Sequence, residues 1–297
     1  MRIGIDLGGS HIGLGLVEGE EILEKKVHNF SSEEKIEIES FLEKWILEAL
    51  EQLLQNIDKN EVKQIGVSTP GVIQNGSITK TTNLNINCFP ITKILQQLLP
   101  VPVLIENDGR CAALAEKQYG NLKDFQNGIF LSLGTGIGAG VFLQGKLIRQ
   151  IKRIGHVIIH PQGRKCNCGK QGCFEAYCSM KAFKKQIRDK EQKGTIPSKE
   201  IVKMLQDEKY DGRFDDIVQE YIEDLAIQIS NLINLFSSEK LVIGGSFVYY
   251  ETILFPKLKA RLDKPDLSIR IEKSKIGIAK FQNEAGIIGA ANLEKVY

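Results

Sequence analysis

Three cysteines and one histidine have the residue types and the spacing of a metal site. Cys166, Cys168 and Cys173 lie within eight positions, and His156 lies ten residues before the first of them. Three thiolates and one imidazole form a closed tetrahedral set, which is typical of structural rather than catalytic zinc. The alternative is a group of buried or spare thiols, but a glycine-rich turn between cysteines suits ligand geometry better than packing. We therefore predict a structural Zn²⁺ bound by these four side chains.

Two nearby residues could compete for this metal. His160 follows the strand-like run Val157-Ile158-Ile159, and Cys178 falls in the helix expected after the cluster. Disulfide bonds explain the cysteines less well, because the chain enters a strand-like run at Arg2 and leaves no room for a secretion signal. We accordingly expect a cytoplasmic protein.

Two glycine-rich turns could cradle phosphate groups. Gly8-Gly9-Ser10 is the first glycine turn, and Gly134-Thr135-Gly136 is the second. Each leads into another strand, whereas the glycine loop of a dinucleotide fold or a Walker motif leads into a helix. Backbone N–H groups converge at such hairpin turns and no side chain obstructs them, so an anion can bind there. Either turn taken alone could also be a tight hairpin without a ligand.

The two turns belong to an internal repeat. An alignment without gaps pairs four identical residues: Leu7 with Leu133, Gly8 with Gly134, Gly19 with Gly145 and Ile22 with Ile148. Each copy is predicted to contain a strand, a glycine-rich turn, a second strand, a glycine-centred turn and a third strand. Four identities could arise by chance, but the shared order of elements favours a duplication.

The segment Glu106-Asn107-Asp108 follows a strand predicted over 101–105. Polar side chains at a strand's end lie where open α/β sheets present their ligand groups. Asn and Asp also favour helix N-caps, so capping of a helix expected over 109–118 is an alternative. Further helices are predicted over 32–57, 179–208, 215–237 and 286–293, and further strands over 62–68 and 241–243.

The overall composition excludes several classes of partner. The 297 residues include 39 basic and 37 acidic ones, for a formal net charge of +2. That balance does not suggest a nucleic-acid or membrane-surface footprint. No apolar run approaches the length of a membrane span. We therefore expect neither nucleic acid nor membrane as a partner.

In chain order, the motifs together resemble those of the ROK family, which contains bacterial glucokinases, fructokinases, N-acetylhexosamine kinases and related repressors. The resemblance runs from Met1 to about Asn292. It rests on these segments: 6–10, 69–71, 82–84, 106–108, 133–138, Gly155-His156, the cysteine cluster 166–175 and 243–245. The cysteine cluster with its upstream Gly-His is the most specific part.

The resemblance implies an α/β protein with the actin-like ATPase (ribonuclease H-like) fold, in which two lobes surround a central cleft. We expect a smaller N-terminal lobe over 1–118 and 285–297, with the first glycine turn and the catalytic Asp. The larger lobe, over 119–284, would hold the second glycine turn, the zinc loop and the adenosine site. Short crossings near Tyr119 and Ala285 would join them.

The resemblance also implies a role for each matching position. Asp108 would be the general base that takes a proton from the attacking sugar hydroxyl. The sugar-binding residues would be Gly71, Asn83, Asn107, Asp108, His156 and Glu175. ATP and Mg²⁺ would be bound through Asp6, Gly8, Gly9, Ser10, Thr135, Gly136, Gly244 and Gly245, with Asp6 orienting the metal through water. The zinc would brace the loop that carries Glu175.

Three positions depart from the family pattern. Arg153 stands where the family usually has a sugar-contacting Glu, so a hydrogen-bond acceptor is replaced by a cation that only donates. Arg153 could indicate another sugar, with an anionic or acetamido group, a replacement contact elsewhere, weakened catalysis, or merely a solvent-facing side chain. His11 stands where Lys or Thr is common. Arg110 stands where small residues are usual; it could reach a phosphate, but we expect it to cover its helix in solvent.

These features predict an ATP-dependent kinase that phosphorylates a hexose or an N-acylhexosamine at its 6-hydroxyl and forms a homodimer. One alternative is a transcriptional repressor. The family's repressors carry a helix-turn-helix segment before the motif that holds the first glycine turn, and this motif begins here at Asp6. The other alternative is a non-catalytic sugar-binding or sensing protein of the same fold, which Arg153 allows although Asp108 and both turns are retained.

Overall fold

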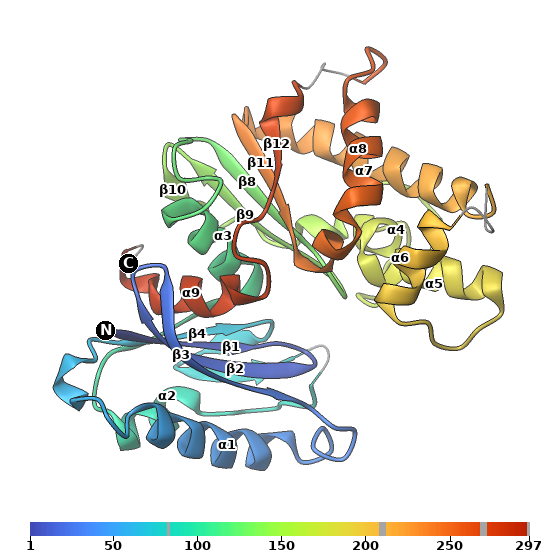
Figure 1. Ribbon diagram of the computed structural model, residues 1–297. Helices are drawn as coiled ribbons and strands as arrows, with labels where there is room; N and C mark the ends of the chain where they lie inside the picture. The colour runs from blue at the N-terminus through green and yellow to red at the C-terminus, as the bar shows by residue number, and fades with distance from the viewer. Residues whose placement is uncertain (82–83, 208–211, 268–271, 296–297) are drawn as a thin grey trace. The chain divides into compact units, whose positions relative to one another are not determined.

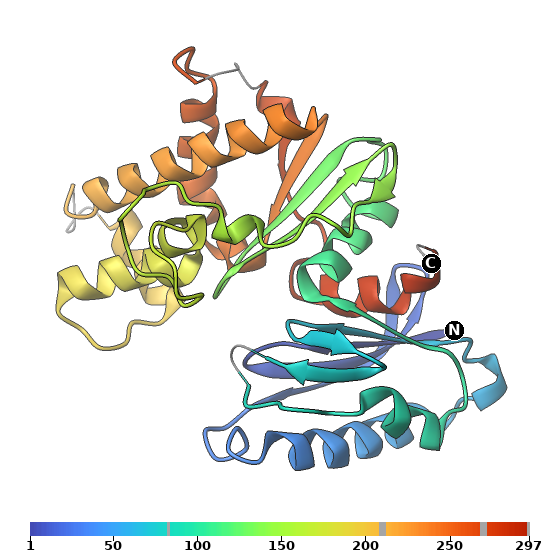
Figure 2. The ribbon, with the colours of Figure 1, turned by 180° about the vertical axis from the view of Figure 1, so that it is seen from behind.

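A computed structural model of the chain describes residues 1–81, 84–207, 212–267 and 272–295. The chain divides into two compact units. Unit 1 comprises Met1–Tyr119 and the segment from Asn283 onward, and unit 2 comprises Gly120–Gln282 (Figures 1 and 2). Each unit contains a five-stranded mixed sheet and a hydrophobic core of its own.

The two sheets have the same strand order. The sheet of unit 1 has the order β3-β2-β1-β4-β7, from β1 (Arg2–Leu7), β2 (His11–Glu18), β3 (Glu21–Asn29), β4 (Ile65–Thr69) and β7 (Val103–Asn107). The sheet of unit 2 has the order β10-β9-β8-β11-β12, from β8 (Gly128–Leu133), β9 (Ile137–Leu143), β10 (Lys146–Leu147), β11 (Lys240–Gly244) and β12 (Ile276–Ile278). In each, three antiparallel strands are followed by two that join in parallel. This shared order confirms the predicted duplication.

The ungapped alignment of the two copies is wrong by one residue beyond the first turn. Leu7 pairs with Ile12 across the β1–β2 hairpin, whereas Leu133 pairs with Ile137 across β8–β9. The first connection therefore encloses four residues and the second three. Gly19 and Gly145, which lie in the turns after the second strands, are consequently not equivalent in the two copies.

Alternation along the strands of unit 1 separates an apolar face from a polar one. Ile3 and Ile5 are fully buried in the core formed with α1 (Ile38–Leu53) and α2 (Ile91–Leu98), while Gly4 faces α9 (Ala285–Ala291). A Cβ on Gly4 would lie 2.1 Å from the carbonyl oxygen of Ile287, so helix α9 lies against the sheet only because this residue is glycine. Asp6, two residues further along β1, also faces α9.

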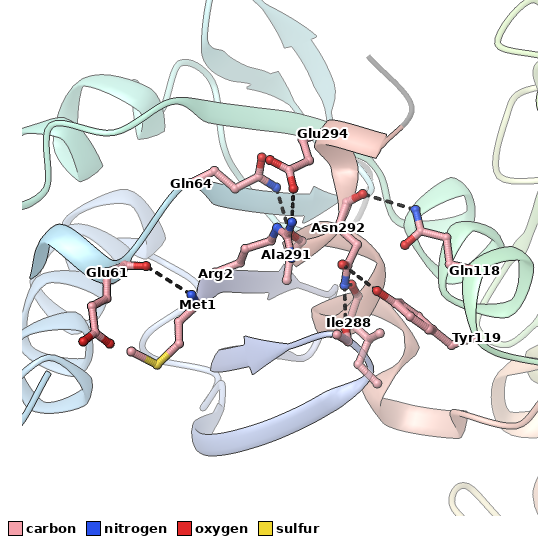
Figure 3. A network of polar contacts seen from close by, with 11 residues as sticks. Met1, Arg2, Glu61, Gln64, Gln118, Tyr119, Ile288, Ala291, Asn292 and Glu294 are labelled. Carbon is pink, nitrogen blue, oxygen red and sulfur yellow. Dashed lines mark hydrogen bonds and ion pairs between the residues drawn. The ribbon is translucent and has the colours of Figure 1, made fainter. Parts of the chain in front are cut away.

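Polar contacts hold the C-terminal segment on this sheet (Figure 3). The side chain of Gln64 donates a hydrogen bond to the carbonyl oxygen of Ala291 at 2.7 Å. The buried Asn292 accepts from the Tyr119 hydroxyl at 3.0 Å through Oδ1, and its carbonyl accepts from Gln118 at 3.2 Å. These bonds attach the end of α9 to the residue before β4 and to the end of α3 (Asp108–Gln118), so distant parts of the sequence complete unit 1.

The first predicted helix is shorter than expected. Periodicity suggested a helix over 32–57, but α1 begins at Ile38 and ends at Leu53, and Ile36 is 76% exposed. Ser31 and Glu34 form a separate turn before α1, in which the Glu34 carboxylate accepts the Ser31 N–H at 2.7 Å and the Ser31 hydroxyl accepts the Glu34 N–H at 3.2 Å. This reciprocal pair is a capping box, which normally begins a helix, but the non-helical backbone of Glu37 (φ −116°, ψ 48°) stops the turn from continuing into α1.

Unit 2 carries five α-helices within the described residues: α4 (Phe174–Cys178), α5 (Met180–Glu191), α6 (Ser198–Gln206), α7 (Asp215–Phe236) and α8 (Glu251–Leu262). The predicted helix over 179–208 is two helices, because Gln192 adopts a left-handed backbone and Pro197 precedes α6. The helix predicted over 215–237 is confirmed as α7. In the described ranges, no helix is both long enough and apolar enough to cross a membrane.

Candidate functional site

Polar side chains meet at the carboxyl ends of three neighbouring strands in unit 1. The strand register pairs Asp6 of β1 with Ser68 of β4, and Ser68 with Glu106 of β7. Residues in register on parallel strands lie on one face, so these three side chains form a row on the face that carries α9. The buried Ser68 hydroxyl donates to Asp6 Oδ1 at 2.6 Å. We did not predict Ser68, whose one sequence signal was its place before Thr69-Pro70-Gly71.

Asp108 begins α3 directly after this row. Its Oδ1 accepts the N–H of Gly109 at 2.7 Å and the side-chain amide of Asn107 at 2.9 Å. Burial, and secondarily the negative charge of Asp6, raise the pKa of Asp108 above that of an ordinary aspartate. The Asn107 side chain makes no capping bond to the helix. Of the two residues, Asp108 rather than Asn107 therefore bonds a backbone N–H in the first turn of α3.

Glu106 and Arg110 form an ion pair across the first turn of α3. Arg110 donates to Glu106 Oε1 at 3.0 Å, and the same oxygen accepts the Asn107 N–H at 2.8 Å. The two side chains are only 13% and 5% exposed for Arg110 and Glu106 respectively. The expectation that Arg110 is solvated is therefore wrong, because its charge is needed opposite a buried carboxylate. Glu106 thus holds the backbone N–H of Asn107 and the side chain of Arg110, one on each side of Asp108.

We expect Arg110→Met to lower the free energy of unfolding by about 3 kcal/mol, because it removes the cation of the ion pair while the Glu106 carboxylate stays buried. Urea unfolding of the purified protein measures this change. The double variant Glu106→Gln/Arg110→Met should be less destabilised than Arg110→Met alone. Equal stability of Arg110→Met and the wild type would show that the pair is solvated in solution.

The first glycine turn is closed by its own backbone and by His11. The N–H of Gly8 donates to the carbonyl oxygen of His11 at 2.9 Å, and a Cβ on Gly8 would lie 2.9 Å from the imidazole. The His11 Nε2 lies 3.8 Å from Asp6 Oδ2, and contact with this carboxylate raises the pKa of His11. The imidazole thus places a titratable positive charge between the turn and Asp6.

Two further predicted sugar-binding residues of unit 1 are Gly71 and Asn83. A Cβ on Gly71 would lie 2.5 Å from the side chain of Ile78. Glycine is therefore required at 71 to let the hairpin of β5 (Val72–Gln74) and β6 (Ser77–Lys80) fold back, whatever else it contacts. Asn83 lies outside the described residues.

The second glycine turn is supported by residues that follow it in the chain. The N–H of Gly134 donates to the carbonyl oxygen of Gly136 at 3.0 Å, and Thr135 between them is exposed. The next N–H, of Ile137, donates to Glu175 Oε2 at 2.9 Å. A Cβ on Gly155 would lie 2.9 Å from Ile137. Unit 2 thus brings together the second glycine turn, the Gly155-His156 pair and Glu175.

Gly244 and Gly245 lie beside the same turn. Gly245 has a left-handed φ of 72°, and a Cβ there would lie 2.7 Å from the carbonyl oxygen of Leu133, the residue before the turn. A Cβ on Gly244 would lie 2.8 Å from the ring of Phe130. Both glycines therefore let the end of β11 pass close to the end of β8.

The four predicted zinc ligands lie together in unit 2. One ligand atom from each of His156, Cys166, Cys168 and Cys173 lies within 4.8 Å of all the others. Cys166 Sγ is 3.7 Å from His156 Nδ1, and Cys168 Sγ is 3.6 Å from Cys173 Sγ. Zn–S bonds of 2.3 Å in a tetrahedron place the sulfurs about 3.8 Å apart. The donor set and its spacing therefore fit zinc.

The competing ligands are placed elsewhere. His160 Nε2 is 2.6 Å from Asp224 Oδ1 on α7, and its ring packs against Tyr177. The strand expected over 157–159 is also absent from the structure, where only Ile158 forms an isolated bridge, with Cys173. Cys178 is fully buried at the end of α4. The His160–Asp224 pair attaches the loop before the cysteines to α7.

Arg153 lies three residues before His156 at the start of a short 3₁₀ turn. Its backbone is left-handed, with a φ of 62°, and its side chain is exposed. Left-handed backbone is uncommon for residues other than glycine, Asn and Asp, so the turn itself holds Arg153 in this conformation. The side chain is accessible to a ligand.

The repeated five-stranded order, with a glycine turn after the first strand of each unit, defines an actin-like ATPase fold. The ROK family model matches residues 2–296. The chain therefore belongs to the ROK family, as its motifs predicted.

Characterised relatives include enzymes and regulators. The chain is 30% identical to a glucokinase of Thermotoga maritima, an alignment that covers 99% of this chain and 96% of that protein. It is 28% identical to a xylose repressor of Caldicellulosiruptor bescii, with 97% of this chain and 76% of the repressor covered. Among solved structures, the ROK hexokinase of Thermus thermophilus has a TM-score of 0.75 and 28% identity, over 98% of this chain and 96% of the other.

Proposed function

We propose that this ROK protein is an ATP-dependent sugar kinase. It transfers the γ-phosphoryl group of ATP to a hydroxyl of a hexose or an N-acylhexosamine, at O6. The observation that carries the proposal is Asp108, a carboxylate of raised pKa held at the end of β7 in the unit that carries the first glycine turn. Membership of a family with a glucokinase relative supports the same conclusion.

Asp108 acts as the general base. Its carboxylate accepts the proton of the attacking hydroxyl as the oxygen forms its bond to the γ-phosphorus and the bond to the bridging oxygen of ADP breaks. The products are a sugar phosphate and ADP. Asn107, whose amide is bonded to Asp108, orients the carboxylate and contacts a neighbouring sugar hydroxyl. Asn83, Gly71, His156 and Glu175 supply the remaining sugar contacts.

The two glycine turns bind the phosphates through backbone N–H groups. Gly8, Gly9 and Ser10 serve in unit 1 and Thr135 and Gly136 in unit 2, with Gly244 and Gly245 at the adenosine. Asp6 is held by Ser68 in the row of polar side chains and suits a water-mediated Mg²⁺. Bound Mg²⁺ would neutralise charge that develops on the phosphates. The Cys₃His set would bind Zn²⁺ in a structural role, because its four protein ligands leave no position open for a substrate.

Arg153 is the residue expected to restrict the choice of sugar. We expect Arg153→Glu to raise kcat/KM for glucose or an N-acetylated hexosamine by at least about tenfold, because a hydroxyl-accepting group returns to that position. Both side chains meet the same left-handed backbone, so the exchange adds no new strain. Steady-state kinetics across sugars measures the effect, with Lys152→Glu on the adjacent exposed residue as the control. Unchanged kinetics in Arg153→Glu would show that Arg153 does not restrict the choice of sugar.

A non-catalytic sugar sensor of the same fold is the second candidate. The similarity to a xylose repressor favours it. The retention of Asp108 and both glycine turns favours the kinase, since binding a sugar alone needs no complete set of phosphate contacts.

The site of phosphorylation tests the proposed chemistry. The protein is incubated with MgATP and a sugar that it turns over, and the product is analysed by mass spectrometry and ³¹P NMR. The proposal expects one added phosphoryl group, with coupling of phosphorus to the two protons on C6. Coupling to a single ring proton would place the phosphate on another hydroxyl and overturn the assignment to O6.

We also propose a cytoplasmic homodimer, which the family resemblance implies. Analytical ultracentrifugation of the purified chain should give twice the mass of 33.2 kDa. A monomer at micromolar concentration would exclude the dimer.

A further inference from the structure

Glu175 contacts the second glycine turn directly. Its Oε2 accepts the backbone N–H of Ile137, the residue that follows the turn, at 2.9 Å. A Cβ on Gly136 would lie 2.6 Å from the same oxygen. The carboxylate therefore lies flush against the turn, at a distance that only a glycine at position 136 permits.

The anchoring of Glu175 is independent of the turn itself. Glu175 lies in the first turn of α4, two residues after Cys173, and its Oε1 is 3.9 Å from Cys166 Sγ. The N–H of Phe174 donates to the carbonyl oxygen of Val157 at 2.8 Å, which attaches the start of α4 to the loop after His156. The carboxylate is thus presented to the turn by the loop that holds the cysteines.

This contact has a consequence for the backbone donors of the turn. The Gly134 N–H is already bonded to the Gly136 carbonyl, and the Ile137 N–H is bonded to Glu175. With both ends of the turn fixed, the N–H groups of Thr135 and Gly136 between them are held in one orientation. Donors that are oriented before an anion arrives bind it more tightly, because no ordering cost remains at binding.

We propose that Glu175 is a positioning residue for nucleotide phosphate, acting through the backbone of the second glycine turn. This role rests on the proposed kinase function and is separate from any contact of Glu175 with the sugar. This role predicts that removing the charge of Glu175 while keeping its hydrogen bond does not weaken nucleotide binding. The negative charge of Glu175 repels phosphate, so only the hydrogen bond, and not the charge, favours nucleotide binding.

Two substitutions separate the bond from the charge. Glu175→Gln keeps an acceptor oxygen for the Ile137 N–H and removes the charge, whereas Glu175→Ala removes both. Glu200→Ala is the matched control, because Glu200 also lies in the first turn of a unit 2 helix, is 48% exposed and pairs with Lys193. Circular-dichroism melting curves establish that each variant is folded.

The test is calorimetric titration of each protein with the magnesium complex of AMPPNP in the absence of sugar. We expect Glu175→Ala to raise the Kd about fivefold to tenfold, which is the usual effect of one lost hydrogen bond. Glu175→Gln should bind as tightly as the wild type or more tightly, and Glu200→Ala should be unchanged. Hydrogen exchange of the Ile137 amide should be at least about tenfold faster in Glu175→Ala than in the wild type and in Glu175→Gln.

The possible failures are distinguishable. An unchanged Kd in Glu175→Ala, or an equal loss in the Gln and Ala variants, overturns the positioning role while the kinase proposal stands. A wild-type protein that binds no nucleotide overturns the kinase proposal and this inference with it.

Discussion

Replacing Asp108 by Asn should reduce kcat about 10³-fold, with sugar binding largely retained. General-base catalysis contributes roughly 10²- to 10⁴-fold in enzymes, and the amide cannot accept the proton. The amide oxygen can still accept the Gly109 N–H that now bonds Asp108 Oδ1, so the start of α3 is preserved. Turnover is measured by coupled ADP release, and sugar binding by calorimetry without nucleotide. Near-normal turnover would remove Asp108 as the base.

The same substitution should stabilise the fold at neutral pH. The folded-state pKa of Asp108 is raised by burial and by Asp6. The ionised form therefore opposes folding at pH 7, and this penalty disappears as the pH falls through the folded pKa. Asp108→Asn should accordingly melt at a higher temperature than the wild type at pH 7, with the difference vanishing below about pH 4. The exposed Asp189→Asn is the control and should show neither effect.

Loss of zinc should have the second largest effect. We expect purified protein to contain about one zinc per chain, and Cys173→Ser to lose the metal and most of its activity. Its melting temperature should fall by at least about 10 °C, since each kcal/mol is worth roughly 2–4 °C in a domain of this size. The physical reason is that Cys173 immediately precedes α4, which carries Glu175, so the metal fixes the loop that supports the second glycine turn.

Two other cysteines make the zinc test specific. Cys88 is exposed in unit 1, and Cys178 is buried in unit 2 but lies outside the ligand set. Cys88→Ser and Cys178→Ala should both retain the metal, measured by atomic emission on protein purified without chelator. A wild-type protein that is metal-free and fully active would show that these three cysteines and His156 do not form a zinc site.

Much of the fold could be predicted because its signals are local. The duplication followed from the order of strands and turns around Gly8 and Gly134, and the helix α7 from its apolar period. The errors are local too. The early start assigned to α1 missed the non-helical backbone of Glu37, which separates the capped turn at Ser31 and Glu34 from the helix.

The candidate site was predictable where spacing carried the information. The four zinc ligands lie within 18 positions, and the structure brings their donor atoms together. Contacts between distant segments could not be found this way. Ser68 bonds Asp6 from 62 residues away, and His160 meets Asp224 from 64 residues away. Each pairing depends on strand register or helix packing, which no local motif encodes.

The residue types alone also left the roles of two charged side chains open. Arg110 was expected in solvent, but the buried Glu106 one helical turn before it supplies its partner. Glu175 was assigned to the sugar through resemblance, whereas its contact with the Ile137 N–H depends on where α4 begins relative to β9. In both cases the sequence identified the residue but did not show which group its side chain contacts.

The most direct test of the central claim is a coupled ADP-release assay with ATP and Mg²⁺ across a panel of sugars. The panel contains glucose, fructose, mannose, allose, N-acetylglucosamine and N-acetylmannosamine, with a sugar-free reaction as the baseline. A kinase should release ADP strongly with at least one sugar, and Asp108→Asn should abolish that release. ADP release no faster than the baseline with every sugar, from folded and zinc-replete protein, would contradict the kinase and favour a sugar sensor.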